Sequence, residues 1–261
     1  MKFVHITDIH LRAEGEHLNG GIPSERFDAC LGDITRWHPE TSFAVISGDL
    51  SEFAEECSYR FLKSRLERLP FPCFLMIGNH DERATFLSVF ENHPQDQHGF
   101  IQHRHEAEGN VFLFLDTTKD GADVHEGQLC EQRLAWLKAQ LIDAGDKPTY
   151  VFIHHPPFDI GISWVDELKL VEIEDFAQAL NHGRNIKHVF FGHVHRMTYV
   201  NWRGFPFTSL PSLNHQAALN PDSVDGRFCD EPPAYGVVQI EPDKLTVHFN
   251  TFLQRNPLHQ T

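Results

Sequence analysis

Five short apolar segments of the chain each end in a side chain that can bind a metal ion, and this pattern limits the possible folds more than any other feature. In open α/β sheets, ligands bind beyond the carboxyl ends of the strands. If the five segments are neighbouring strands, their ends converge and scattered positions form one cluster. The polar groups in question are Asp8 and His10, Asp49, Asn79 and His80, His154, and His193 and His195.

The rest of the chain predicts helices between these strands. Strand-like runs are expected at 3–6, 43–46, 71–77, 98–105, 111–115, 150–153 and 187–191, and helical spacing of apolar residues at 24–38, 53–68, 83–90, 127–144 and 165–181. Ser24 is a possible N-cap of the first helix. From residue 197 the pattern is β without intervening helices, at 197–202, 205–210, 234–240 and 244–252. Strand–helix alternation followed by β structure indicates mixed sheets with helices outside.

We expect one domain over residues 1–261, in which the β-rich segment 197–261 forms a cap or an oligomer contact. No linker, repeat or low-complexity tract interrupts the chain. The length is ample for a large buried core.

Charge and cysteine content limit the partners and the compartment. Acidic residues outnumber basic ones by 37 to 22, a formal net charge of −15, which argues against binding a nucleic acid polymer through its phosphates. Bound cations would still let such a chain attract a small anion. The five cysteines have no metal-ligand or redox spacing, and no apolar stretch is long enough to span a bilayer. A cytoplasmic protein with reduced thiols is expected.

Local geometry around the polar groups suggests how they would converge. Asp8 and His10 flank Ile9, so in an extended segment both would point to the same side, and His193 and His195 flank Val194 in the same way. A glycine precedes Asp49, Asn79 and His193, and is expected to let the backbone turn sharply at each strand end.

The donor set of carboxylate, amide and imidazole groups suits Mn, Fe, Co or Zn, whereas calcium takes oxygen ligands almost alone. Two such ions roughly 3.5–4 Å apart neutralise a phosphate ester and activate a water molecule. Each motif alone is weak, because a Gly-Asp after a strand is often only a turn. All five in succession, each at a strand end, predict a metal site.

The order D-x-H, G-D, G-N-H-D, H, G-H-x-H resembles the calcineurin-like metallophosphoesterase superfamily. Within it the chain is similar to the bacterial class III cyclic nucleotide phosphodiesterases and the related glycerophosphodiesterases, over residues 1 to about 215. The resemblance implies a four-layer αββα sandwich, two mixed β-sheets flanked by helices, with a dinuclear metal centre and a metal-bridging hydroxide as nucleophile. One ion would be held by Asp8, His10, Asp49 and His195, the other by Asp49, Asn79, His154 and His193.

The resemblance also implies roles for residues near the metals. His80 would act on the substrate phosphate, stabilising the transition state or protonating the leaving oxygen. His154 is the expected ligand of the His154-His155 pair, so His155 is expected to support it or to pack. Asp81 is expected either to orient His80 or to cap the helix at 83–90.

Substrate contacts are expected from Asn79, His80 and His195, and from three further residues. Arg12 and His17 lie in the loop 12–21, which would line the entrance. His215 matches a position near the substrate in relatives, although a solvated loop histidine is an equal alternative. Asn19 stands where several relatives have an aromatic residue.

Three functions fit these residues. The first is a phosphodiesterase acting on small diesters, such as cyclic nucleotides or glycerophosphodiesters. The second is a phosphomonoesterase or nucleotidase using the same metals, which would need extra cations near the site, where Arg12 is the one obvious candidate. The third is a non-catalytic interaction scaffold, which would be expected to have lost ligands. We also expect a homo-oligomer, with its contact in the segment 221–252.

Overall fold

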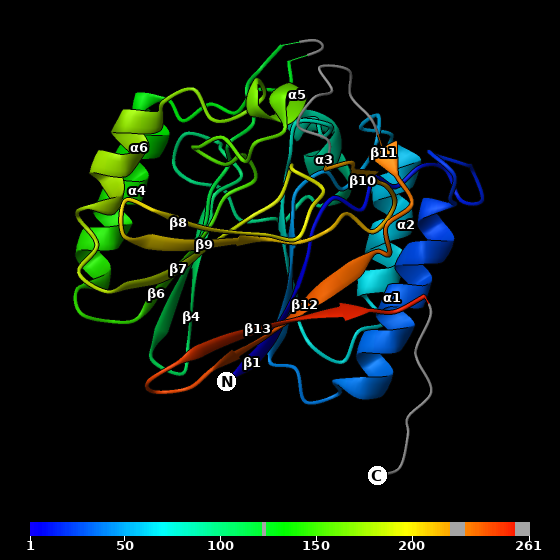
Figure 1. Ribbon diagram of the computed structural model, residues 1–261, viewed down its shortest axis with the longest axis horizontal. Helices are drawn as coiled ribbons and strands as arrows, with labels where there is room; N and C mark the ends of the chain where they lie inside the picture. Colours follow the sequence, from blue (N-terminus) through cyan, green and yellow to red (C-terminus); the bar gives the residue numbers. More distant parts are fainter. Residues whose placement is uncertain (122–123, 220–227, 254–261) are drawn as a thin grey trace.

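Two β-sheets packed face to face form the centre of the molecule (Figure 1). The computed structural model describes residues 1–121, 124–219 and 228–253. The five-stranded sheet has the order β13-β12-β1-β2-β3, and the six-stranded sheet the order β4-β5-β6-β7-β9-β8. Both are mixed, since β1–β2–β3 and β5–β6–β7–β9 are parallel while β12, β13, β4 and β8 pair antiparallel. The strands are β1 (Lys2–Ile6), β2 (Phe43–Ser47), β3 (Cys73–Met76), β4 (His103–Ala107), β5 (Asn110–Phe114), β6 (Thr149–Phe152), β7 (Ile186–Phe191), β8 (Thr198–Trp202), β9 (Phe205–Ser209), β12 (Ala234–Ile240) and β13 (Leu245–Thr251), with β10 (Gln216–Ala217) and β11 (Phe228–Cys229) forming a small separate pair.

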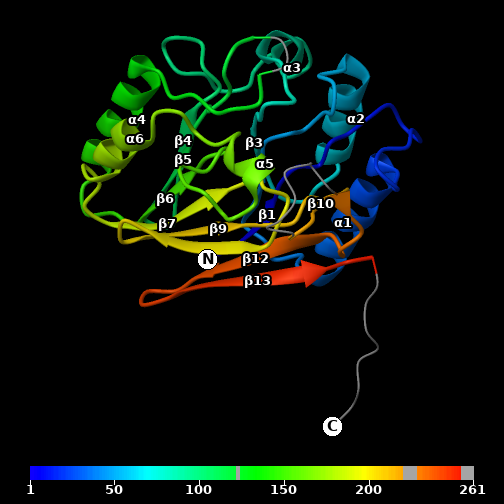
Figure 2. The ribbon, with the colours of Figure 1, turned by 45° about the horizontal axis from the view of Figure 1, so that its top comes forward.

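Helices cover the outer face of each sheet and complete four layers (Figure 2). One outer core joins α1, α2 and α3 to the five-stranded sheet, and another joins α4 and α6 to the six-stranded sheet. The expected αββα sandwich is therefore confirmed. The helices are α1 (Pro23–Trp37), α2 (Glu56–Leu66), α3 (Arg83–Val89), α4 (Glu131–Ala144), α5 (Ser163–Asp166) and α6 (Ile173–Leu180). Among the described residues, none of the helices could cross a bilayer.

The alternation of side chains along each strand divides the apolar residues between the layers. In β1, Val4 packs outward against the helices, whereas Phe3 packs inward between the sheets. Phe3 stacks on Phe43 at a centroid distance of 5.0 Å and meets Phe112, Phe152 and Phe190 of the opposite sheet edge-on. This aromatic cluster fixes the two sheets against each other, and hence the loops at their edges.

Several expected elements differ in detail. The single helix expected at 165–181 is two helices, α5 and α6, and the strand expected at 98–105 begins only at His103. Ser24 does not cap α1: Ile22 is the N-cap residue, Pro23 opens the helix, and the Ser24 hydroxyl accepts a hydrogen bond from Gly15 N–H instead.

The β-rich segment after residue 197 does not stand apart as a layer of its own. Its strands β8 and β9 extend the six-stranded sheet, and β12 and β13 complete the five-stranded one. The β8–β9 and β12–β13 hairpins lie side by side in both ribbon views (Figures 1 and 2).

Removing the central ring of the inter-sheet cluster should be costly. Phe3→Ala is expected to lower the free energy of unfolding by about 3–5 kcal/mol, because it leaves a cavity among four rings. Chemical denaturation measures the free energy of unfolding. Phe53→Ala is the matched control, since that ring is 60% exposed and its loss should change stability by only about 0.5 kcal/mol. Equal effects of the two substitutions would contradict the role given to Phe3.

Candidate metal centre

The polar groups singled out in the sequence meet at one edge of the sandwich. Asp8 and His10 follow β1, Asp49 follows β2 and Asn79 follows β3, while the remaining groups, His154, His193 and His195, follow β6 and β7. The parallel strands of the two sheets thus contribute to one site from opposite layers. Ligand atoms of Asp8, His10, Asp49 and His195 lie within 4.8 Å of one another, as do those of His154, His155 and His193.

Three imidazoles in this cluster are oriented by hydrogen bonds on one ring nitrogen. His154 Nδ1 donates to the Ser47 carbonyl at 2.8 Å, and His195 Nδ1 donates to the His215 carbonyl at 2.9 Å. His10 Nδ1 donates to Glu52 Oε2 at 2.7 Å. Each Nε2 is then left as a lone pair that faces the carboxylates, which is how histidine ligands are held in metal proteins.

The distances between these donor atoms suit a shared cation. His10 Nε2 lies 2.9 Å from His195 Nε2, and His195 Nε2 lies 3.4 Å from Asp8 Oδ1. Asp49 Oδ2 lies 3.6 Å from His10 Nε2 and 3.3 Å from His154 Nε2, so one oxygen faces both halves of the cluster. Ligands bound about 2.1 Å from one ion are spaced at about 3.0–3.5 Å in octahedral or tetrahedral geometry.

Buried nitrogens without hydrogen bonds mark the second half of the cluster. His154 Nε2, His155 Nε2 and His193 Nε2 are buried and have no hydrogen-bond partner. His193 Nδ1 lies 2.9 Å from Asn79 Oδ1. A buried imidazole nitrogen without a partner is costly in an apolar interior, so these residues fit a bound metal ion.

The electrostatic environment favours a cation. Burial disfavours a charged imidazole, yet Asp49 and then Asp8 raise the pKa of His154 to about 9. Burial also opposes ionisation of Asp49, but the surrounding histidines, His154 first, hold its pKa well below the usual value. Positive charge is thus stabilised between these residues.

The backbone at the site is not extended, and the expected alternation around Ile9 and Val194 is wrong. Asp8, His10, Asp49, His193 and His195 all have left-handed φ, between 44° and 70°. The side chains converge through tight turns after each strand rather than through the pleat. A non-glycine residue in this conformation is strained, and such residues cluster at functional sites.

The glycines beside the ligands act mainly through the space they leave. Only Gly48 has positive φ, at 109°, and a Cβ there would lie 2.3 Å from His154 Nδ1. A Cβ on Gly78 would lie 2.2 Å from Asp49 Oδ1, and one on Gly192 would lie 2.2 Å from Thr7 Oγ1. Sharp turning was expected of all three, but at Gly78 and Gly192 the requirement is the absence of a side chain.

A buried chain of hydroxyl groups holds Asp8 from behind. Thr7 Oγ1 donates to Asp8 Oδ2 at 2.6 Å, and Ser47 Oγ donates to Thr7 Oγ1 at 2.9 Å. Ser47 Oγ must then accept from His5 Nε2, 2.8 Å away. All donors point toward the carboxylate, so the chain fixes its rotation.

Asp81 connects two of the loops. It accepts hydrogen bonds from the N–H groups of Leu50, Ser51 and Gly78 and from the Tyr59 hydroxyl. Asp81 takes neither expected role. The N-cap of α3 is Glu82, and His80 is oriented by a hydrogen bond from its Nδ1 to the Glu52 carbonyl.

Two residues near the cluster were missed by the sequence interpretation. Glu52 fixes His10 and lies 3.7 Å from His80 Nδ1, and its carbonyl accepts from His80 Nδ1 at 3.0 Å. His125 Nδ1 accepts from the Asn79 amide at 3.0 Å. Glu52 could have been found from the sequence, because it lies only three residues after the expected ligand Asp49. His125 lies in a loop without a motif, so the sequence gives no reason to select it.

The cluster opens into a cavity of about 290 Å³. Of the expected substrate contacts, Asn79, His80, His195 and His215 line it. Arg12 and His17 do not line it. The Arg12 guanidinium is paired with Glu16 at 2.6 Å and Glu55 at 3.3 Å, and His17 is exposed.

His155 is held by a hydrogen bond on one of its ring nitrogens. Its Nδ1 lies 2.7 Å from Thr117 Oγ1, and its ring centroid lies 4.6 Å from that of His193. Its Nε2 is buried without a hydrogen-bond partner and belongs to the same group of possible ligand atoms as His154 and His193, so the expectation that His155 supports His154 or packs stays a prediction.

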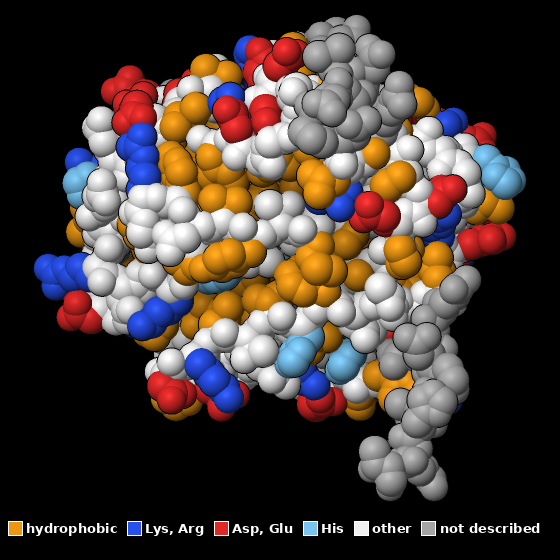
Figure 3. Space-filling model, viewed as in Figure 1, with side chains coloured by type: hydrophobic (Ala, Val, Ile, Leu, Met, Phe, Trp, Pro, Cys, Tyr) orange, Lys and Arg blue, Asp and Glu red, His pale blue; other side chains and the backbone are white. Residues whose placement is uncertain are grey.

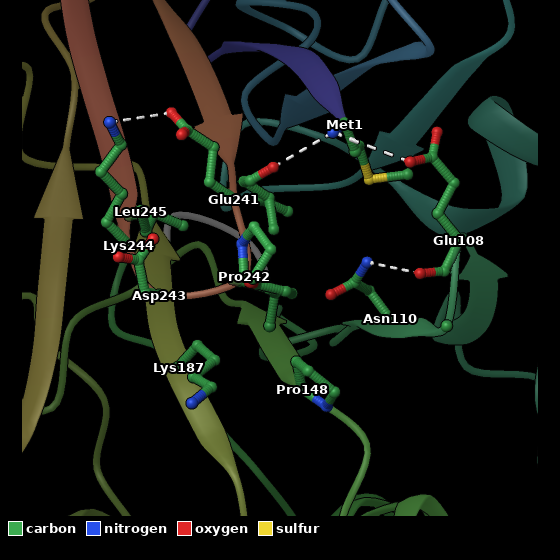
Figure 4. A pocket seen from close by; sticks show the side chains of 13 residues that line it. Met1, Glu108, Asn110, Pro148, Lys187, Glu241, Pro242, Asp243, Lys244 and Leu245 are labelled. Atoms are coloured by element: carbon green, nitrogen blue, oxygen red, sulfur yellow. Dashed lines mark hydrogen bonds and ion pairs between the residues drawn. The ribbon is translucent and has the colours of Figure 1, made fainter.

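A larger cavity, about 580 Å³, lies at the opposite edge (Figure 4). Asn110, Tyr150 and Lys187 line it, at the amino ends of β5, β6 and β7. Ligands of α/β sheets bind at the carboxyl ends. The smaller cavity is accordingly the candidate functional site.

Comparison with known proteins agrees with this site. The family model described as calcineurin-like phosphoesterase matches residues 1–197. The chain belongs to the calcineurin-like phosphoesterase family. It is thus a hydrolase of phosphoric esters, and the expected family and enzyme class are confirmed.

Relatives and solved structures cover nearly the whole chain. A probable cyclic nucleotide phosphodiesterase of Rhodopseudomonas palustris is 38% identical over 99% of this chain and 95% of its own length. A glycerophosphodiester phosphodiesterase of Enterobacter lignolyticus is 28% identical over 90% of this chain and 85% of its own. The crystal structure of a dimetal phosphatase from Danio rerio shares the fold, with a TM-score of 0.74 at 15% identity, covering 97% of this chain and 96% of that one.

A side chain at Gly192 should disturb metal binding without backbone strain. Gly192→Ala would place a Cβ 2.2 Å from Thr7 Oγ1 and 3.0 Å from Asp8 Oδ2, so it is expected to displace Asp8 and weaken metal binding at least about tenfold. Isothermal titration calorimetry with Mn²⁺ measures the metal affinity of each variant. Gly32→Ala is the control, since nothing lies within 4 Å of a Cβ there. Unchanged affinity in Gly192→Ala would show that Asp8 is not held as described.

Proposed function

We propose that this protein hydrolyses small phosphodiesters at a dinuclear metal centre. The observation that carries the proposal is the set of three oriented imidazoles, His10, His154 and His195, whose free Nε2 atoms face two buried carboxylates at metal-ligand spacing. Relatives named as phosphodiesterases support the reaction class. A degenerate scaffold is disfavoured, because no expected ligand is missing.

The two ions would share Asp49, whose Oδ2 faces both halves of the cluster. The mixed donor set suits Mn, Fe, Co or Zn. When bound, such ions neutralise the phosphate and activate water for attack at phosphorus. Asp8, His10, Asp49 and His195 would hold one ion, and Asp49, Asn79, His154 and His193 the other.

In this proposal His80 would protonate the leaving oxygen. Its backbone N–H donates to Asp49 Oδ1 at 2.9 Å, and its Nδ1 donates to the Glu52 carbonyl, which leaves Nε2 free. Burial opposes a charged imidazole, yet Asp49 and Glu52 raise the pKa of His80. As the P–O bond breaks, the leaving oxygen would take its proton from His80 Nε2.

The cavity favours a diester over a monoester. No lysine or arginine is among the residues lining it in the described parts of the chain. A monoester carries one more negative charge, which an additional cation near the site would favour, and Arg12, the one candidate, is paired with glutamates.

Parallel assays on bis(p-nitrophenyl) phosphate and p-nitrophenyl phosphate with Mn²⁺, Co²⁺, Zn²⁺ and Fe²⁺ test the reaction class. We expect kcat/KM for the diester to exceed that for the monoester by at least about tenfold. A preference for the monoester would favour the phosphomonoesterase alternative, and no turnover with any metal would favour the scaffold.

Two neighbouring substitutions separate metal binding from proton transfer. Asn79→Ala is expected to remove one ion, because the amide oxygen lies 2.9 Å from His193 Nδ1 at that half of the cluster. His80→Ala should retain both ions and lower kcat by about 10²–10⁴-fold. Metal content by mass spectrometry and steady-state kinetics measure the two effects. The exposed His98→Ala serves as a control, and equal metal loss in both site variants would contradict the role of His80.

We also propose that the protein self-associates in the cytoplasm. β8 and β13 are edge strands and present unpaired backbone groups. Hydrophobic side chains gather in the middle of the face seen in Figure 3, and Tyr199 of β8 and Met197 just before it are exposed. All five cysteines are unpaired, which suits a reducing compartment.

A dimer or larger assembly is expected by light scattering. Tyr199→Glu should shift the mass toward the monomer if β8 lies in the contact, because a buried unpaired charge is costly. A monomeric wild-type mass would contradict self-association.

A further inference from the structure

The larger cavity, at the end of the sandwich opposite the metal cluster, opens between the two sheets (Figure 4). Two turns wall it: the β4–β5 turn, with Glu108 and Gly109, and the β12–β13 turn at residues 241–244. The amino ends of β6 and β7 contribute Tyr150 and Lys187. The volume of about 580 Å³ lies within the range of about 300–1,000 Å³ that small-molecule sites occupy. The expected metal ligands are not among its described lining residues, so it is a separate cavity.

Asn110 places an unused hydrogen-bond acceptor in this cavity. It is the first residue of β5 and is only 7% exposed. Its amide nitrogen donates to the carbonyls of Ala107, at 3.3 Å, and Glu108, at 3.1 Å, which fixes the orientation of the amide. Figure 4 shows the amide oxygen directed away from these carbonyls and into the cavity. This oxygen has no hydrogen-bond partner among the residues that the structure describes.

Tyr150 contributes a second polar group on the neighbouring strand. Phe112 pairs with Tyr150 across β5 and β6, and Asn110 precedes Phe112 by two residues, so all three side chains point into the gap between the sheets. The Tyr150 ring stacks on Phe112 with centroids 5.3 Å apart. Tyr150 is 2% exposed, and within the described parts of the chain its hydroxyl has no hydrogen-bond partner. Burial raises the pKa of Tyr150 to about 12, so the hydroxyl keeps its proton and can both donate and accept.

These two polar groups lie among apolar side chains. Ile240, Leu245, Pro148 and Pro242 line the same cavity. A buried polar atom without a partner in the protein is costly unless a ligand or an ordered water molecule meets it. A ligand that fits this lining has an apolar body and a polar group at one end.

The charges at the mouth favour a neutral ligand. Glu241 pairs with Lys244 at 3.0 Å, and the Glu108 carboxylate lies 3.7 Å from the terminal amino group. Lys187 and Asp243 are exposed and form no ion pair with the other described residues, and their charges are opposite in sign. A site for a phosphate ester or another anion would require an excess of positive charge. The mouth offers none.

We propose that this cavity binds a small neutral alcohol or phenol with a compact apolar body, whose hydroxyl donates to Asn110 Oδ1 and accepts from the Tyr150 hydroxyl. The acceptor-only amide oxygen requires a donor on the ligand, and the protonated phenol supplies a donor in return. This inference does not depend on the proposed phosphodiesterase activity, because it concerns the other end of the molecule.

Three probes that share one ring system test the assignment. 2-Naphthol can donate and accept a hydrogen bond, 2-methoxynaphthalene can only accept, and 2-naphthoate is charged. Isothermal titration calorimetry with the Mn²⁺-loaded protein is expected to give a Kd for 2-naphthol below about 1 mM. 2-Naphthol should bind at least about tenfold more tightly than either of the other probes, because an unmatched buried acceptor or a desolvated charge is costly.

Four variants locate the binding site. Asn110→Leu removes the acceptor at similar size and should bring the affinities for 2-naphthol and 2-methoxynaphthalene within about twofold of each other. Asn110 also closes the β4–β5 turn, so Tyr150→Phe is a second variant: it keeps the ring on Phe112 and should weaken 2-naphthol by about fivefold. Leu245→Trp places a larger side chain in the cavity and should weaken 2-naphthol at least about tenfold. Asn92→Leu is the matched control, since Asn92 is exposed and does not line the cavity, and it should change nothing.

Four results would overturn the inference. Unchanged affinity for 2-naphthol in Leu245→Trp would place the ligand elsewhere, and an unchanged preference in Asn110→Leu would remove the role of the amide. Tighter binding of 2-naphthoate would mean that the cavity takes an anion. No binding of 2-naphthol to the wild type at millimolar concentration would mean that ordered water alone meets the polar groups. Hydrolysis of bis(p-nitrophenyl) phosphate is measured separately, so the proposed function stands or fails independently of these results.

Discussion

The crowding of like groups at one buried edge is the constraint on which the rest of this structure depends. His10 Nε2 and His195 Nε2 approach to 2.9 Å, and two lone pairs at that distance repel unless a proton or a metal ion lies between them. Asp8 and Asp49 are both fully or almost fully buried beside them. Their mutual repulsion and desolvation would also oppose folding without a compensating cation. Asp49 and Asp8 raise the pKa of His154 to about 9 against the effect of burial, which shows that a positive charge beside these carboxylates is stabilised.

Such a strained arrangement persists only if many interactions with the surrounding structure hold it in place. Five ligand candidates are held at left-handed φ, a conformation that costs of order 1–3 kcal/mol at each residue. The interactions that offset this backbone strain lie behind the ligand residues. The hydroxyl chain from His5 through Ser47 and Thr7 fixes Asp8. Asp81, in the loop after β3, accepts two hydrogen bonds from the loop after β2, one from its own loop and one from Tyr59 of α2. The aromatic cluster around Phe3 then keeps the two sheets, and so the two halves of the site, in register.

The sequence predicted those features that follow from a repeated local pattern. Each polar group sits directly after an apolar strand, so strand order alone brings Asp8, Asn79 and His193 to one edge. The backbone there could not be predicted from alternation, because Asp8 and His10 lie beyond the last residue of β1 in turns that Gly48 and Gly192 leave room for. Asp81 was ambiguous for a similar reason: its partners are backbone N–H groups of another loop, and no spacing reveals them.

Substrate contacts were harder still to predict, and the reason is electrostatic. A search for phosphate-binding residues turns to cations such as Arg12, but in an acidic chain that side chain is already paired with Glu16 and Glu55. In the proposed function metal ions would supply the positive charge, which is consistent with a cavity lining that has no lysine or arginine among the described residues. Two of the residues that line the cavity, His215 and Phe228, lie beyond residues 1–197, the part that the family model matches. The expected metal ligands all lie within residues 1–197, so the segment that follows can alter the lining of the cavity without altering the ligand set.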